Sequence, residues 1–172
     1  MPNLKTLLKK KLNGAKKIAV LGVGSVLRND DAAGPLVAEE LKKIRNSKLK
    51  VFLGSTAPEN LTGEIIKYRP THIIIVDSVD MDQRPGSILL IDPRIVDGVS
   101  FSTHMLPVKM IVDYFLESLK CEIIIIGIQP KSLEFGETVS NEVRKSAKQI
   151  ADVIRQILQE DIYKTKDYIK GL

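Results

Sequence analysis

Ile18-Ala19-Val20-Leu21 is an apolar run of strand length, and it stops at the glycine-rich stretch Gly22-Val23-Gly24-Ser25. From Pro35 onward, apolar residues recur at helical spacing through Ile44, with charged residues between them. A strand, a tight loop and a helix in this order form the repeating unit of proteins with a parallel sheet. The stretch therefore predicts an α/β fold and marks the carboxyl end of its first strand.

The same alternation continues along the chain. Further strands are expected at Val51-Phe52-Leu53, Ile73-Ile74-Ile75-Val76, Ser87-Ile88-Leu89-Leu90-Ile91 and Ile123-Ile124-Ile125-Ile126, and further helices over Leu4 to Leu12, after Thr56, from Val108 to Leu119 and from about Ser140. Only about ten residues separate Val76 from Ser87, which is too short for a helical crossover, so the strand at Ser87 is expected to be antiparallel. The pattern predicts a three-layer α/β/α sandwich around a mixed, mostly parallel five-stranded sheet.

The length of 172 residues is that of one domain. We expect a single domain over 1–172, with a basic N-terminal helical arm at 1–16, a core at 17–158 and a C-terminal tail at 159–172. The tail is rich in lysine and only weakly periodic, so fraying is expected there.

The net charge of +5 is concentrated in the N-terminal arm. Residues 1–17 contain six lysines and no acid, whereas the remaining 155 residues carry 20 basic and 21 acidic side chains. Tryptophan is absent and aromatic residues make up 5%, so stacking platforms for nucleic acid are scarce and no nucleic-acid partner is expected. A single cysteine, no export signal and no apolar run of membrane-spanning length favour a cytoplasmic protein that is not inserted in a membrane.

Polar side chains gather where the expected strands end. Because ligands of α/β sheets bind at the carboxyl ends of the strands, these positions are the candidates for chemistry. They are Gly22, Gly24, Ser25, Asp30 and Asp31 after the first strand, Asp77, Ser78, Asp80 and Asp82 after the third, His104 before a long helix, and Gln129 and Glu134 after the last strand.

Several familiar chemistries lack their motifs. The third glycine of a dinucleotide fingerprint is replaced by Leu27, and Asp30 and Asp31 would repel a pyrophosphate. Neither a Walker phosphate loop nor a G-x-S-x-G nucleophile elbow is present, and Cys121 stands at the entrance of a strand. With only His72 and His104 in the chain, a three-histidine zinc site is impossible.

Two carboxylates and one imidazole remain. Asp31, Asp77 and His104 would give a mixed oxygen and nitrogen site for a borderline divalent metal. Simpler roles stay open, because Asp31 could cap the following helix and His104 could be an ordinary surface or capping histidine. The residues alone indicate a metal-dependent α/β hydrolase.

The motifs as a set resemble the [NiFe]-hydrogenase maturation endopeptidases. The resemblance rests on the run from Ile18 to Gly34, on Ile75-Val76-Asp77-Ser78, on Ser102-Thr103-His104 and on Gly127-Ile128-Gln129-Pro130 followed by Glu134, Gly136 and Ser140. It covers roughly residues 17 to 158. This chain departs from the family pattern at Ser25, Ala32 and Gln129, where asparagine, glycine and an acid are more usual.

This resemblance implies an aspartic-type endopeptidase that removes the C-terminal extension of the nickel-loaded hydrogenase large-subunit precursor. It implies that Asp31, Asp77 and His104 are both the metal-binding and the catalytic residues. The nickel would arrive in the precursor, so no permanently bound cofactor is expected. The alternatives are a non-catalytic module that binds a nucleotide or a metal, and a metallohydrolase of small substrates.

Overall fold

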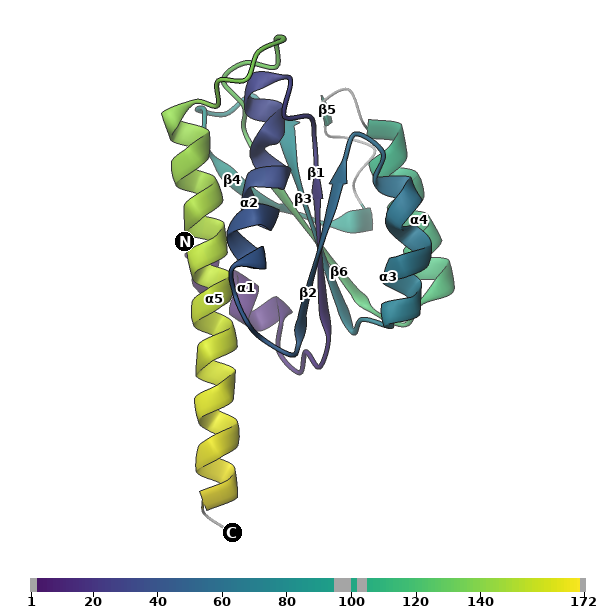
Figure 1. Cartoon of the computed structure of the whole chain (residues 1–172), viewed down its shortest axis with the longest axis vertical. Coiled ribbons are helices and arrows are strands. Elements are labelled where there is room, and N and C mark those ends of the chain that lie inside the picture. The colour runs from purple at the N-terminus through teal and green to yellow at the C-terminus, as the bar shows by residue number, and fades with distance from the viewer. Residues whose placement is uncertain (1–2, 95–99, 102–104, 171–172) are drawn as a thin grey trace.

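The computed structural model describes residues 3–94, 100–101 and 105–170 (Figure 1). The elements are α1 (Leu4–Lys11), β1 (Ile18–Val23), the 3-10 turn η1 (Asn29–Ala32), α2 (Ala33–Lys42), β2 (Leu49–Ser55), η2 (Pro58–Leu61), α3 (Thr62–Tyr68), β3 (His72–Asp80), β4 (Ile88–Ile91), β5 (Ser100–Phe101), α4 (Met105–Ser118), β6 (Glu122–Ile128) and α5 (Asn141–Lys170).

The strands form one mixed sheet in the order β2-β1-β3-β6-β4, and the short β5 pairs with the end of β3. β1, β2, β3 and β6 run parallel, whereas β4 runs antiparallel to β6, as the short connection before it predicts. The chain leaves β1 for β2 on one side and reaches β3 on the other side. The carboxyl ends of β1 and β3 are therefore the switch point at which open α/β sheets bind their ligands.

Two layers of helices cover the sheet, with α1, α2 and α5 on one face and α3 and α4 on the other (Figure 1). Successive strand residues alternate between the two cores, because side chains of a strand point to opposite faces. In β3, Ile74 and Val76 pack in the core under α2 and α5, while Ile73 and Ile75 pack in the core under α3 and α4. The expected three-layer sandwich is confirmed.

Several elements extend further than the sequence pattern predicts. β3 continues past Val76 to Asp80, so that Asp77 lies inside the strand, and α5 continues to Lys170 through the segment expected as a tail. β5 is an additional short strand. A strand or helix continues as long as its backbone finds partners, so it can extend beyond the apolar run that signals it.

The basic arm is a helix that packs on the domain. Leu8 and Leu12 are buried in the same core as Ile154 and Leu158 of α5. Lys5 and Lys9 form ion pairs with Glu160 at the surface. The lysines thus flank a packed apolar stripe, which is the usual design of an amphipathic surface helix.

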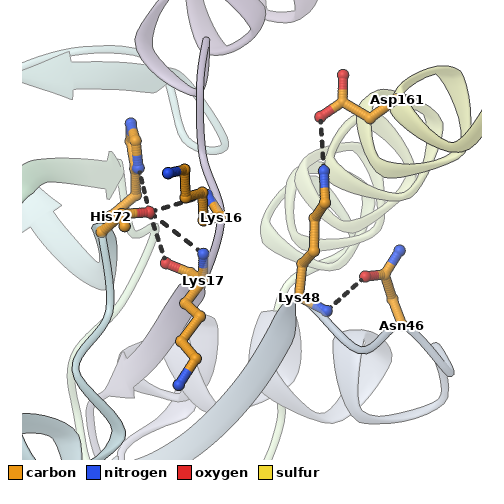
Figure 2. A network of polar contacts seen from close by, with 7 residues as sticks. Lys16, Lys17, Asn46, Lys48, His72 and Asp161 are labelled. Atoms are coloured by element: carbon orange, nitrogen blue, oxygen red, sulfur yellow. Dashed lines mark hydrogen bonds and ion pairs between the residues drawn. The ribbon is translucent and has the colours of Figure 1, made fainter. Parts of the chain in front are cut away.

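Polar contacts close the amino end of the sheet (Figure 2). The hydroxyl of Thr71 accepts hydrogen bonds from the backbone N–H groups of Lys16 and Lys17 and contacts Nδ1 of His72 at 3.0 Å. Lys48 forms an ion pair with Asp161 of α5. His72, the first residue of β3, therefore lies at the end of the sheet opposite to the predicted site.

Helix α2 approaches the sheet closely because Gly34 has no side chain. A Cβ atom at Gly34 would lie 2.2 Å from the carbonyl oxygen of Val23 and 2.3 Å from that of Val76. Both are backbone atoms and cannot rotate away. Gly34 therefore sets the distance between the start of α2 and the ends of β1 and β3.

We predict that Gly34→Ala destabilises the fold by roughly 1 to 3 kcal/mol, because the helix must move away from the sheet. The matched control is Gly63→Ala in α3, where nothing lies within 4 Å of the added methyl group. Alanine should stabilise that helix by up to about 1 kcal/mol. Urea unfolding of both variants measures the difference, and equal effects at the two glycines would contradict the close-approach argument.

Candidate active site

Asp31 joins the ends of β1 and β3. It lies in η1, is almost fully buried, and accepts hydrogen bonds from the Ser25 N–H at 2.9 Å and from the Ser78 hydroxyl at 2.8 Å. The alternative role as the N-cap of α2 is wrong, because Ala32 occupies that position. The Asp31 carboxylate is therefore directed at the switch point of the sheet.

Asp77 lies in β3, is completely buried and is a neighbour of Asp31. Its Oδ1 atom accepts a hydrogen bond from the Ser78 N–H at 2.8 Å, whereas its buried Oδ2 atom has no hydrogen-bond partner among the described residues. Burial and, secondarily, the nearby Asp31 carboxylate raise the pKa of Asp77 well above its usual value, against the opposing effect of the Ser78 N–H. The site therefore contains a buried carboxylate oxygen, Oδ2 of Asp77, to which no described residue donates a hydrogen bond.

Ser78 connects the two carboxylates. Its backbone N–H donates to Asp77 and its hydroxyl donates to Asp31, so one residue orients both acids. Each of these hydrogen bonds restricts the orientation of the carboxylate that accepts it. Two oriented carboxylates in a dehydrated site can bind a divalent cation or hold a proton for acid–base chemistry.

The third predicted residue, His104, lies outside the described residues. Helix α4 begins directly after it, at Met105. In the part of the chain that the structure describes, no group of three or more histidine, cysteine or acidic side chains could hold a metal ion. The described site therefore consists of the two carboxylates and the donors around them.

Asp30, the neighbour of Asp31, has a structural role in connecting loops. Its buried carboxylate accepts hydrogen bonds from the backbone N–H of Lys131 at 2.7 Å and from the backbone N–H and hydroxyl of Ser140 at 2.6 and 2.9 Å. It therefore fastens the loop after β6, and the start of α5, to the turn that carries Asp31. Residue type alone places Asp30 at the rim of the sheet and does not indicate this role. The signal that could have indicated it is the pair of adjacent acids, because successive side chains of a turn point in different directions.

Gln129 organises the loop that follows β3. Its side-chain oxygen accepts from the Met81 N–H at 2.7 Å, and its amide nitrogen donates to Asp80 at 3.1 Å. That bond from Gln129, followed by one from the Asp82 N–H, lowers the pKa of the Asp80 carboxyl. An acid at position 129 could accept from Met81 but, when ionised, could not donate to Asp80, so the contact with Asp80 depends on the amide of Gln129.

Gly22 near the end of β1 and Gly24 directly after it serve internal packing. A Cβ atom at Gly22 would lie 2.4 Å from the Gly34 carbonyl oxygen, and one at Gly24 would lie 1.8 Å from that of Asp31. The backbone of η1 and α2 therefore fills the space that a dinucleotide pyrophosphate would need. This geometry disfavours the nucleotide-binding alternative.

Comparison with known proteins identifies the family. The model of the HycI hydrogenase maturation protease family matches residues 35–160. The chain belongs to the hydrogenase maturation protease family. The hydrogenase 3 maturation protease of Escherichia coli is 34% identical over 132 residues, which make up 76% of this chain and 84% of that protein.

Solved structures of hydrogenase maturation proteases share the fold. HycI from Thermococcus kodakarensis has a TM-score of 0.81 at 31% identity, over 89% of this chain and 99% of its own. The endopeptidase HycI from Escherichia coli has a TM-score of 0.70 at 31% identity, over 79% of this chain and 87% of its own. The expected peptidase activity is confirmed at the level of the family, in preference to the binding-module alternative. Among the described residues, no helix of this hydrogenase maturation protease is both long and apolar enough to cross a membrane.

We predict that Asp77→Asn stabilises the fold at pH 8 by about 1 kcal/mol or more, because burying an ionised carboxylate costs free energy that burying a neutral amide does not. The pKa of Asp77 is higher in the folded than in the unfolded chain, so the folded state binds more protons and stability falls as pH rises above the ordinary value of 3.8. Below that value the carboxyl is protonated in both states and the cost disappears.

The advantage of the asparagine variant should therefore shrink as the pH is lowered from 8 toward 4. Urea unfolding at both pH values checks this, with Asp82→Asn at an exposed position as the control. An advantage of equal size at both pH values would contradict the assignment of the cost to the buried charge.

Proposed function

We propose that this peptidase removes the C-terminal extension of a nickel-loaded [NiFe]-hydrogenase large-subunit precursor. The observation that carries the proposal is the pair of buried carboxylates at the switch point, in which Oδ2 of Asp77 has no hydrogen-bond partner among the described residues. The location we expect for this reaction is the cytoplasm.

A divalent cation would offset the electrostatic cost of this pair. Burial and, secondarily, repulsion by the Asp31 carboxylate raise the pKa of Asp77 and so disfavour its ionisation. Nickel accepts both oxygen and imidazole ligands, so the side-chain types of Asp31, Asp77 and His104 would suit it. In this proposal the nickel is part of the substrate, and it enters the site with the precursor.

The chemistry then follows from the position of the cation. A precursor whose nickel is bound by Asp31 and Asp77 has its scissile bond held near a cation that can polarise the carbonyl group and lower the pKa of an attacking water. Among the described residues, no cysteine lies at the site to act as a nucleophile. Cys121 directly precedes β6 and therefore lies at the amino end of the sheet. Burial, and secondarily Glu122, raises the pKa of the Cys121 thiol, which disfavours the reactive thiolate.

The same arrangement accounts for selectivity toward loaded precursor. Binding energy from the metal is available only to a substrate that carries it, so an unloaded precursor lacks the interaction that positions its scissile bond. The enzyme then needs no separate sensor for nickel insertion.

The test is processing of purified precursor by Asp31→Asn, Asp77→Asn and His104→Ala proteins. Each variant should remain folded and reduce the rate of cleavage by at least about a hundredfold, as expected for loss of a group that acts in the transition state. The matched control is Asp82→Asn, which makes the same chemical change at an exposed position five residues after Asp77 and should cleave like the wild type.

The substrate side of the same assay compares nickel-loaded and nickel-free precursor. Only the loaded form should be cut by the wild type. Cleavage at the wild-type rate by all three site variants would overturn the assignment of the catalytic residues. Equal cleavage of the two precursor forms would overturn the role of nickel, and a metal bound stoichiometrically to the purified enzyme would favour the metallohydrolase alternative.

A further inference from the structure

An apolar patch lies on the loops next to the site. We define the loop patch as Val26, Leu27 and Phe135, whose exposed fractions are 56%, 56% and 82%. Val26 and Leu27 follow β1, and Phe135 lies in the loop after β6. Three large apolar side chains presented to solvent by two interlocked loops form the kind of surface that binds another molecule.

Hydrogen bonds join the two loops and fix the loop patch. The Gly136 N–H donates to the Leu27 carbonyl at 2.9 Å, and the Asn29 N–H donates to the Gly136 carbonyl at 2.7 Å. The guanidinium of Arg28 donates to the carbonyl of Leu133 and lies 5.3 Å from the centre of the Phe135 ring. The patch is therefore held in place before any partner binds, which lowers the entropic cost of binding.

The loop patch is continuous with the carboxylate site. Ser25, the residue before Val26, donates its N–H to Asp31, and its hydroxyl accepts from the Leu27 N–H at 3.3 Å. A polypeptide whose scissile bond lies at Asp31 and Asp77 must leave the site across the surrounding loops. Tyr114 and Leu116 are also exposed, but they lie in the last turns of α4, which ends shortly before the amino end of β6.

We propose that the loop patch is a docking surface for an apolar segment of the protein substrate, adjacent to the peptide bond that is cleaved. The inference rests on the proposed function, because the occupant is the hydrogenase large-subunit precursor. Continuity with the site selects this occupant over a second copy of the chain. The cationic Arg28 at the edge of the patch favours a segment in which an acidic or polar residue flanks the apolar ones.

The experiment combines binding and kinetics on the full chain with nickel-loaded precursor. The Leu27→Ser/Phe135→Ser protein should show a Kd and a KM about tenfold or more above the wild type, because truncating apolar anchors at an interface weakens binding. Its kcat at saturating precursor should stay within about twofold, since Asp31 and Asp77 are unchanged. Two single variants at the same position are compared as well. Phe135→Ser should bind the precursor more weakly than the wild type, whereas Phe135→Leu keeps an apolar side chain and should retain most of the wild-type affinity.

The matched control is Leu7→Ser/Leu116→Ser, which removes exposed apolar side chains from α1 and α4. It should bind and cleave like the wild type. Equal Kd and KM for the patch and control variants would overturn the docking surface. A loss of kcat at unchanged KM would also overturn it, because it would show that the patch only supports the position of Asp31. A wild-type dimer that the patch substitutions dissociate would assign the patch to self-association.

The same data separate this inference from the proposed function. Precursor that binds the wild type, binds the patch variant more weakly and is never cut would contradict the proposed function and support the docking surface. Cleavage by the wild type with unaltered binding by the patch variant would contradict the docking surface alone. A wild type that neither binds nor cuts the precursor would overturn both.

Discussion

The burial of two carboxylates against each other is the constraint on which the rest of the site depends. Asp31 and Asp77 lose their hydration at the ends of neighbouring parallel strands, and Ser78 donates a hydrogen bond to each of them. Such a pair is unfavourable in a folded protein unless a cation or a proton compensates it. The fold therefore maintains an electrostatic cost at its switch point, as is common where a protein performs chemistry.

Close backbone packing makes this arrangement possible. Gly24 and Gly34 let the turn between β1 and α2 lie directly on the strand ends, where a Cβ atom at either position would collide with backbone carbonyl oxygens. Asp30 then fastens that turn to the loop after β6 through the backbone of Lys131 and Ser140. Two neighbouring residues of one short turn thus have different roles: Asp30 binds the loop after β6, and Asp31 faces the site.

The sequence allowed most of this architecture to be predicted, because apolar periodicity and strand-end polarity are local signals. It located Asp31 and Asp77 and the antiparallel direction of β4. It could not show that β3 runs on to Asp80, since a strand continues through polar residues when neighbours supply its hydrogen bonds. The roles of Asp30, Ser78 and Gln129 depend on which atoms meet across the fold, and residue type alone does not determine that. The tail after residue 158 lacked a strong periodic pattern and yet continues α5 as a helix.

Nickel coordination in the enzyme–precursor complex tests the central claim most directly. X-ray absorption at the nickel edge can be recorded on loaded precursor alone, and on precursor frozen immediately after mixing with wild-type or Asp77→Asn enzyme. We predict that the wild type adds oxygen or nitrogen ligands to the nickel and that Asp77→Asn reduces this change. A nickel spectrum that does not change while the wild type cleaves the precursor would contradict the claim that the buried carboxylates recognise the metal.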